Sequence, residues 1–177
     1  MFKKIGLSVI YAVGLGILSQ QVYAGNEGKT IVKQGFDPLS VVFVTNRDSS
    51  DIAVIDMKTN KVIDHIACGD CCNPHMTMAT MDGKRLLTTG TQKNYAVITD
   101  LLTREVKKVR LGIAPEHFVI SHNGKWAYIG NMEEGAVSIV DVVNGKEINR
   151  IQGFYEPHGF FHVTRHVQGL CVEPRRT

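Results

Sequence analysis

The chain has 177 residues, with 20 basic and 17 acidic side chains and a formal net charge of +3. This length fits one domain of ordinary size, and the charge is too evenly balanced to give a basic surface for nucleic acid or for a membrane. We therefore expect no nucleic-acid partner.

The first 24 residues have the three parts of an export signal. A positive start is followed by an apolar run from Ile5 to Leu18, and a pattern of small residues ends at Ala24. The apolar run is shorter than the roughly 20 residues that span a bilayer. We predict that residues 1–24 are a signal peptide cleaved before Gly25. The mature chain would be periplasmic or secreted, with no stable membrane anchor and, after losing two lysines, a net charge of +1.

After a lead-in over residues 25–40, a repeat with a period near 41 runs from residue 41 to residue 163. Three stretches share one pattern: FVTNRDSSDIAVIDMKTNKV from Phe43, LTTGTQKNYAVITDLLTREV from Leu87 and YIGNMEEGAVSIVDVVNGKE from Tyr128. Further markers recur at the same period, which indicates a repeat architecture. They are the aspartates Asp56, Asp100 and Asp141 and the prolines Pro74, Pro115 and Pro157.

Each period contains short apolar or alternating runs separated by turn residues, which is typical of strands rather than helices. The aspartate that closes the second run is expected to accept a hydrogen bond from the backbone of a tight turn. The third run is the most charged, as in KVIDHI, EVKKVR and EINRI, and this suits an exposed edge. We predict an all-β fold, a β-propeller of four-stranded blades. About twelve strands, or three blades' worth, are present, so the ring is incomplete.

The motifs resemble a known repeat family. FVTN at residues 43–46 and YIGN at residues 128–131, with the IAVID, VSIVD, Pro-His and D/N-G-K segments that follow, are similar to YVTN-type β-propeller repeats. The resemblance covers about residues 40–163. It implies a relation to the haem-binding propeller of cytochrome nitrite reductases and to quinoprotein amine dehydrogenase propellers. It also implies that the strand beginning with the Pro-His segment is innermost and lines the central channel.

Residues 164–177, TRHVQGLCVEPRRT, do not continue the repeat, because no turn and no further FVTN-like strand follow. We expect a chain that is cut short or shifted in frame after about residue 163. The alternative is a ring completed by another copy or by another protein. Open blade edges favour self-association in both cases.

Three cysteines lie close together in the first repeat, at Cys68, Cys71 and Cys72, within an insertion of two or three residues. The C-x-x-C-H pattern of covalent haem attachment is absent, and a structural zinc site needs four ligands. Because export favours oxidised thiols, we predict a disulfide in this loop, with a pairing that the sequence does not choose. A metal or redox role and unpaired thiols remain alternatives.

Three histidines, His75, His117 and His158, stand near the head of successive predicted inner strands. The register is imperfect, since Pro115 is followed by Glu116 before the histidine. Equivalent positions of a propeller repeat gather around one axis, so we expect the imidazoles to converge at a channel mouth. Our hypothesis is that they bind a haem-type cofactor, a metal ion or an anionic ligand. The alternative is a structural role, with each ring bonded to a neighbouring blade.

Two other groups of residues have simpler interpretations. Met76, Met78 and Met81 carry thioethers that would suit copper, but their alternation along a strand favours packing in the core. Glu133 and Glu134 are interpreted as a solvated turn. We identify no catalytic residue and assign no separate metal site.

Two functions from different classes follow from the sequence. The first is an exported propeller without enzymatic activity, which binds a small ligand or another periplasmic protein through one face. The second is a cofactor-carrying redox propeller or a haem-handling accessory related to cytochrome nitrite reductase. The identity of any cofactor stays unknown.

Overall fold

The structure is a computed structural model that describes residues 22–24, 30–32, 36–37, 39–69 and 73–161. The chain divides into two units, Met1–Gln34 and Gly35–Thr177. In the first unit, β1 (Val22–Ala24) pairs antiparallel with β2 (Thr30–Val32). The predicted cleavage point falls between these two strands, and most of the predicted signal peptide lies outside the described residues. Cleavage and export therefore stay predictions.

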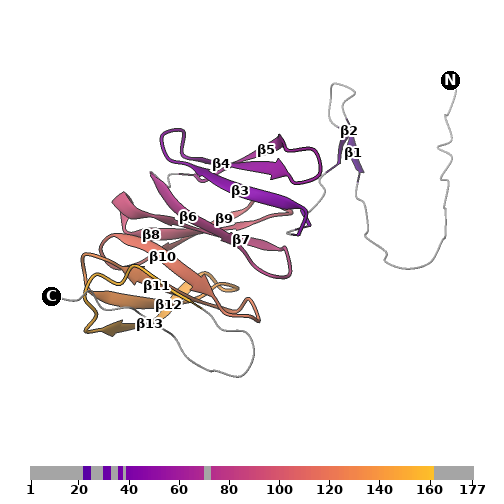
Figure 1. The fold of residues 1–177 in the computed structure, drawn as a ribbon. Helices are drawn as coiled ribbons and strands as arrows, with labels where there is room; N and C mark the ends of the chain where they lie inside the picture. Colours follow the sequence, from indigo (N-terminus) through magenta and orange to yellow (C-terminus); the bar gives the residue numbers. More distant parts are fainter. Residues whose placement is uncertain (1–21, 25–29, 33–35, 38, 70–72, 162–177) are drawn as a thin grey trace, which may run out of the picture. The chain divides into compact units, whose positions relative to one another are not determined.

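The second unit contains three antiparallel sheets that follow one another along the chain (Figure 1). We call them blades 1, 2 and 3. Blade 1 consists of β3 (Val41–Asn46), β4 (Asp51–Asp56) and β5 (Lys61–Ala67). Blade 2 consists of β6 (Pro74–Ala79), β7 (Arg85–Gly90), β8 (Tyr95–Asp100) and β9 (Val106–Arg110), with a 3-10 turn η1 (Thr91–Lys93) between β7 and β8. Blade 3 consists of β10 (Pro115–Ile120), β11 (Trp126–Asn131), β12 (Ala136–Asp141) and β13 (Lys146–Gln152).

Spatial order equals chain order in every blade, so each blade is an up-and-down meander. These eleven strands confirm the predicted all-β architecture of four-stranded blades in an incomplete set. In the part of the chain that the structure describes, no helix has the length and apolar character needed to cross a membrane.

The twelfth predicted strand, expected from His158, is not formed within the described residues. After β13 the chain runs through residues 153–161 without strand pairing. A strand is defined by hydrogen bonds to a neighbouring strand, and none of the described strands pairs with this segment. The segment lies on blade 3 instead, where the amide of Phe154 donates a hydrogen bond to the carbonyl of Gly135 at 3.0 Å.

The repeated aspartates form the turns that the sequence predicted. Each carboxylate belongs to the last residue of the strand next to the exposed outer strand, in β4, β8 and β12, and accepts a hydrogen bond from the amide three residues further along. The pairs are Thr59 to Asp56 at 2.6 Å, Thr103 to Asp100 at 2.8 Å and Asn144 to Asp141 at 2.9 Å. In Asp141 the amide of Asn144 is the largest cause of a lowered pKa. The turns hold the carboxylates ionised, as expected for an oxygen that accepts backbone hydrogen bonds.

A second turn recurs as MDGK at residues 81–84 and as HNGK at residues 122–125, and both copies have the same hydrogen bond. Asp82 accepts the amide of Lys84 at 3.1 Å, and Asn123 accepts the amide of Lys125 at 3.0 Å. The glycines between them have φ of +66° and +69°, a left-handed conformation that favours glycine. These local side-chain interactions explain why the period could be read from the sequence.

The hydrophobic core lies between the blades. One buried cluster joins blade 1 to blade 2, and a second joins blade 2 to blade 3. In β7, Leu86 belongs to the first cluster and Leu87 to the second, because successive side chains of a strand point to opposite faces. Both are fully buried. The central blade therefore contributes one face to each core.

The charged strands lie at one edge of each blade, as predicted. β5, β9 and β13 are largely exposed, and β13 lies beside β9. The opposite edges, β3, β6 and β10, lie next to one another. The strands that begin at Pro74 and Pro115, β6 and β10, thus lie side by side.

Candidate functional site

Two inner strands carry a β-bulge directly after their first proline. In β6 the pairing with β7 shifts between residues 74 and 77, and in β10 the pairing with β11 shifts between residues 115 and 118. A bulge adds one residue to one strand and changes the direction of the side chains there. The bulged segments are residues 75–76 and residues 116–117, which contain the predicted site histidines of both strands.

A buried threonine holds the two bulges together. Thr89, on β7, accepts the amide of Met76 at 3.3 Å and donates its hydroxyl to the carbonyl of Glu116 at 2.6 Å. It therefore ties the bulge of its own blade to the bulge of the next. Thr45 is the residue of the first repeat that aligns with Thr89, since FVTN at residues 43–46 corresponds to LTTG at residues 87–90. Its hydroxyl lies 3.5 Å from the carbonyl oxygen of His75, at the limit of a hydrogen bond.

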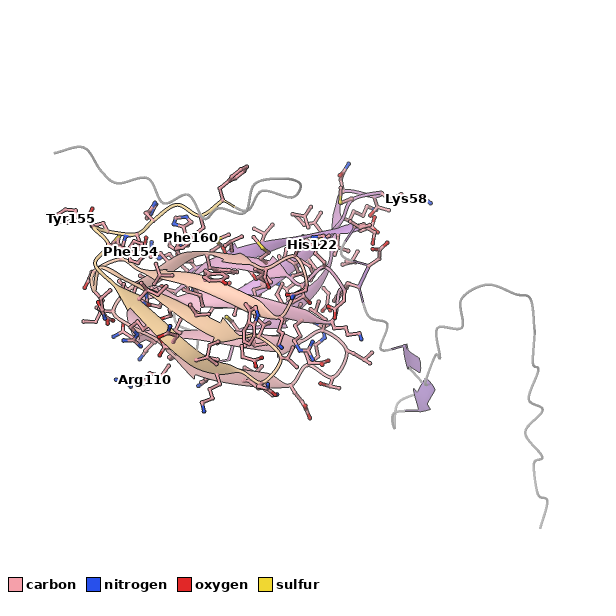
Figure 2. The ribbon with its side chains drawn as sticks, turned by 90° about the horizontal axis from the view of Figure 1, so that it is seen from below. Lys58, Arg110, His122, Phe154, Tyr155 and Phe160 are labelled. Atoms are coloured by element: carbon pink, nitrogen blue, oxygen red, sulfur yellow. The ribbon has the colours of Figure 1, made fainter. Side chains whose placement is uncertain are left out.

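Blade 3 has Gly130 at the position of these threonines. A Cβ atom on this residue would lie 2.3 Å from the carbonyl oxygen of Pro157 and 2.9 Å from the ring of Phe160. Residues 153–161 therefore pack directly on the backbone of β11, on the side where Figure 2 labels Phe160. This contact positions His158, because His158 directly follows Pro157, whose carbonyl lies over Gly130.

The rings of the three predicted histidines meet. The centroids of His75 and His117 are 4.9 Å apart with planes at 89°, and those of His117 and His158 are 4.1 Å apart with planes at 70°. Three imidazoles from three successive repeats thus form one edge-to-face group. The expected convergence is present in the structure, whereas the role of these histidines in cofactor binding stays a prediction.

Glu116, to which the sequence motifs assigned no role, joins this group. Its side chain is 13% exposed, and its Oε2 lies 3.2 Å from Nε2 of His158. Donor atoms of His75, Glu116 and His117 all lie within 4.8 Å of one another. The signal in the sequence was the departure from register, because Glu116 occupies the position that is histidine in the repeats on either side. We call these four residues the histidine cluster.

His117 is the most enclosed of the three histidines. Burial lowers its pKa, and His158 and His75 lower it further, while Glu116 acts in the opposite direction. Its Nδ1 atom is buried without a hydrogen-bond partner in the described part of the chain. A neutral imidazole at physiological pH offers a lone pair to a metal, to a haem iron or to a hydrogen-bond donor.

The cysteine and methionine predictions have mixed outcomes. Cys68 is buried in the core between blades 1 and 2, and the other two cysteines of the loop lie outside the described residues. The disulfide therefore stays a prediction. Met76 and Met78 pack against the core between blades 2 and 3, as expected, but Met81 is exposed in a turn.

Glu134 lies in the turn between β11 and β12, as expected, but the expectation that its side chain is solvated is wrong. Its carboxylate accepts hydrogen bonds from Nη1 of Arg150 at 2.9 and 3.1 Å and from the amide of Ile113 at 3.0 Å. It thus joins β13 to the loop that leads into β10 and its bulge. Glu133 is exposed, as expected for a turn residue.

Comparisons with known proteins agree with this architecture. The structure of hydrazine synthase from Kuenenia stuttgartiensis is similar with a TM-score of 0.61 and 22% identity, over 67% of this chain and 34% of that chain. The structure of the dihydro-haem d1 dehydrogenase NirN in complex with DHE is similar with a TM-score of 0.55 and 20% identity, over 65% of this chain and 25% of that one. These likenesses show the propeller fold alone, and the chain spans about a third and a quarter of the two proteins.

A comparison with curated protein sequences finds no match. The YVTN-type family is not shown by the comparisons, whereas the relation to haem-binding propellers is. The family described as the cytochrome D1 haem domain matches residues 36–163, which contain all three blades and the histidine cluster. The chain therefore belongs to the cytochrome d1 haem domain family.

Proposed function

We propose that this chain is an exported, haem-related propeller module that binds a haem-type cofactor or a similar small ligand at the histidine cluster. The observation that carries the proposal is the meeting of three imidazoles from successive repeats, at centroid distances of 4.9 and 4.1 Å. Membership of the cytochrome d1 haem domain family and the propeller fold support it.

The donor set fits such a group. His117 has a buried nitrogen without a partner among the described residues, while His75 and His158 are exposed and accessible to a ligand. Imidazoles ligate haem iron or donate hydrogen bonds to acidic substituents of the macrocycle. The bound iron would supply redox chemistry, and the residues of this chain would hold and orient the group.

A spectroscopic titration tests this function. Purified chain is titrated with haem d1 and, for comparison, with iron protoporphyrin, and the visible absorption bands are followed. We expect saturable spectral shifts that weaken at least tenfold in His117→Ala and also weaken in His75→Ala and His158→Ala. The control is His65→Ala on the outer strand β5, which should bind as the unchanged protein does. Equal binding by all four variants would contradict the proposal.

A second candidate function is protein binding through blade 1. The face of blade 1 turned away from blade 2 carries Val42 and Val44, which are 44% and 38% exposed. In a closed propeller such a face is covered by the preceding blade, so another copy or another protein would cover it here. Light scattering should show association that Val44→Lys reduces. A monomer at all concentrations, unaltered by this substitution, would exclude self-association.

A further inference from the structure

We propose that the histidine cluster binds a divalent first-row transition-metal ion directly, through His75, Glu116 and His117. This inference goes beyond the proposed haem binding and does not depend on it, because the two groups are alternative occupants of the same imidazoles. The ion would be held by side chains alone, at the point where the bulges of β6 and β10 meet.

The donors are close enough to bind one ion. Bond lengths of about 2.0–2.2 Å to nitrogen and carboxylate oxygen place neighbouring ligands about 3.4 Å apart in a tetrahedral site. The donor atoms of the three residues already lie within 4.8 Å of one another. His75 is exposed, so rotation of its side chain can bring its ring closer to the other two donors.

The backbone that carries the ligands is fixed before any ion binds. Thr89 links the two bulges through hydrogen bonds of 3.3 Å to the amide of Met76 and 2.6 Å to the carbonyl of Glu116. The carboxylate of Glu116 is held in turn by His158, 3.2 Å away. Hydrogen bonds that orient a ligating carboxylate commonly strengthen metal binding by ten- to a hundredfold.

The chemistry of the donor set indicates the class of ion. Two imidazoles with one carboxylate suit zinc, cobalt, nickel, copper or iron, whereas magnesium and calcium prefer oxygen ligands only. Three protein ligands leave a coordination position for water or for a small anion, as in catalytic zinc sites. The expected ligand is thus a divalent transition metal with one open position.

The test uses Co²⁺ and Zn²⁺ as probes on the purified, porphyrin-free and tag-free chain. The background variant Cys71→Ser/Cys72→Ser removes those two thiolates as competing ligands. We expect one ion per chain by calorimetry, together with visible Co²⁺ bands typical of nitrogen and oxygen ligands. Glu116→Gln and His75→Ala should each weaken binding at least tenfold. Circular dichroism and urea unfolding should show that both variants keep their fold. For His75→Ala this is expected because the side chain is exposed and its removal leaves no cavity in the core.

Matched controls are Glu133→Gln and His122→Ala. Both residues are exposed, and His122 lies on the turn between β10 and β11, where Figure 2 labels it. Binding that persists unchanged in Glu116→Gln and His75→Ala, or that falls equally in the controls, would overturn the proposal. So would the absence of stoichiometric binding.

The same variants separate this inference from haem binding. Glu116→Gln keeps all three imidazoles, so it should bind the metal ion at least tenfold more weakly but retain the spectral response to haem. A chain that binds haem and no Co²⁺ refutes the metal site alone, and a chain that binds Co²⁺ and no haem refutes the proposed function alone.

Discussion

Replacing Gly130 by alanine tests whether the last described segment is part of the site. The φ angle of this glycine is not positive, so alanine fits the backbone and the effect is steric. The new Cβ would lie 2.3 Å from the carbonyl oxygen of Pro157, where real Cβ atoms essentially never come closer than 3.0 Å. The obstacle is backbone, which cannot turn aside as a side chain can. The carbonyl must therefore move away from β11.

We expect Gly130→Ala to lower the free energy of unfolding by about 1–3 kcal/mol, the usual cost of overpacking. The same movement should separate His158 from Glu116, which are now 3.2 Å apart. Urea unfolding measures the first effect. The imidazole signals of His158 in a nitrogen-15 NMR spectrum measure the second, with those of His122 as an internal reference.

The matched control is Gly159→Ala in the same segment, because nothing lies within 4 Å of a Cβ atom at that position. This variant should stay within about 0.5 kcal/mol of the unchanged protein. If Gly130→Ala were equally mild and left the His158 signals in place, the packing of residues 153–161 on β11 would be refuted.

Three further outcomes are expected. Hydrogen bonds to its carboxylate lower the pKa of Asp51 from 3.8 to about 2, and the hydrogen bond from the Ser49 side chain has the largest effect. The stability that these bonds give is present above pH 3.8 and is lost as the pH falls toward 2. The urea midpoint should therefore decline over that range, and it should decline less in Asp51→Asn. Leu87→Ala should cost about 2–5 kcal/mol because the residue is fully buried between blades 2 and 3, whereas Leu102→Ala, at a residue that is 55% exposed, should cost less than about 0.5 kcal/mol. The intact mass of the exported protein should correspond to a chain that starts at Gly25, and recovery of the uncleaved chain would refute the signal peptide.

The fold could be predicted from the sequence because its markers act locally. Asp56 and Asp100 each accept a hydrogen bond from the amide three residues further along, so each turn is determined by a few neighbouring residues. The convergence of His75 and His117 followed from the repeat, since the segments after Pro74 and Pro115 occupy equivalent places in neighbouring blades, although the two histidines differ by one position in register.

The features that could not be predicted from the sequence depend on partners that are distant along the chain. Glu116 holds the repeat position of His75 and His158, but the direction of its side chain depends on the bulge in β10, and a bulge is defined by pairing with another strand. Glu134 lies in a turn, but its carboxylate pairs with Arg150, sixteen residues further along, and is therefore not simply solvated. The missing strand at His158 has the same cause, because a strand exists only where a second one pairs with it.

The placement of Leu86 and Leu87 on opposite faces of β7 has a consequence for how the unit comes apart. In repeat architectures, stability is close to a sum of each repeat's own stability and the interfaces with its immediate neighbours. Blade 2 takes part in both cores of the described unit, while blade 1 and blade 3 each take part in one. Either outer blade can open while one interface survives, but blade 2 cannot open without losing both. Amide hydrogens of β7 and β8 should therefore exchange with solvent more slowly than those of β3 or β13. A substitution that destabilises blade 2 should also destabilise both blade 1 and blade 3, because each shares a core with it.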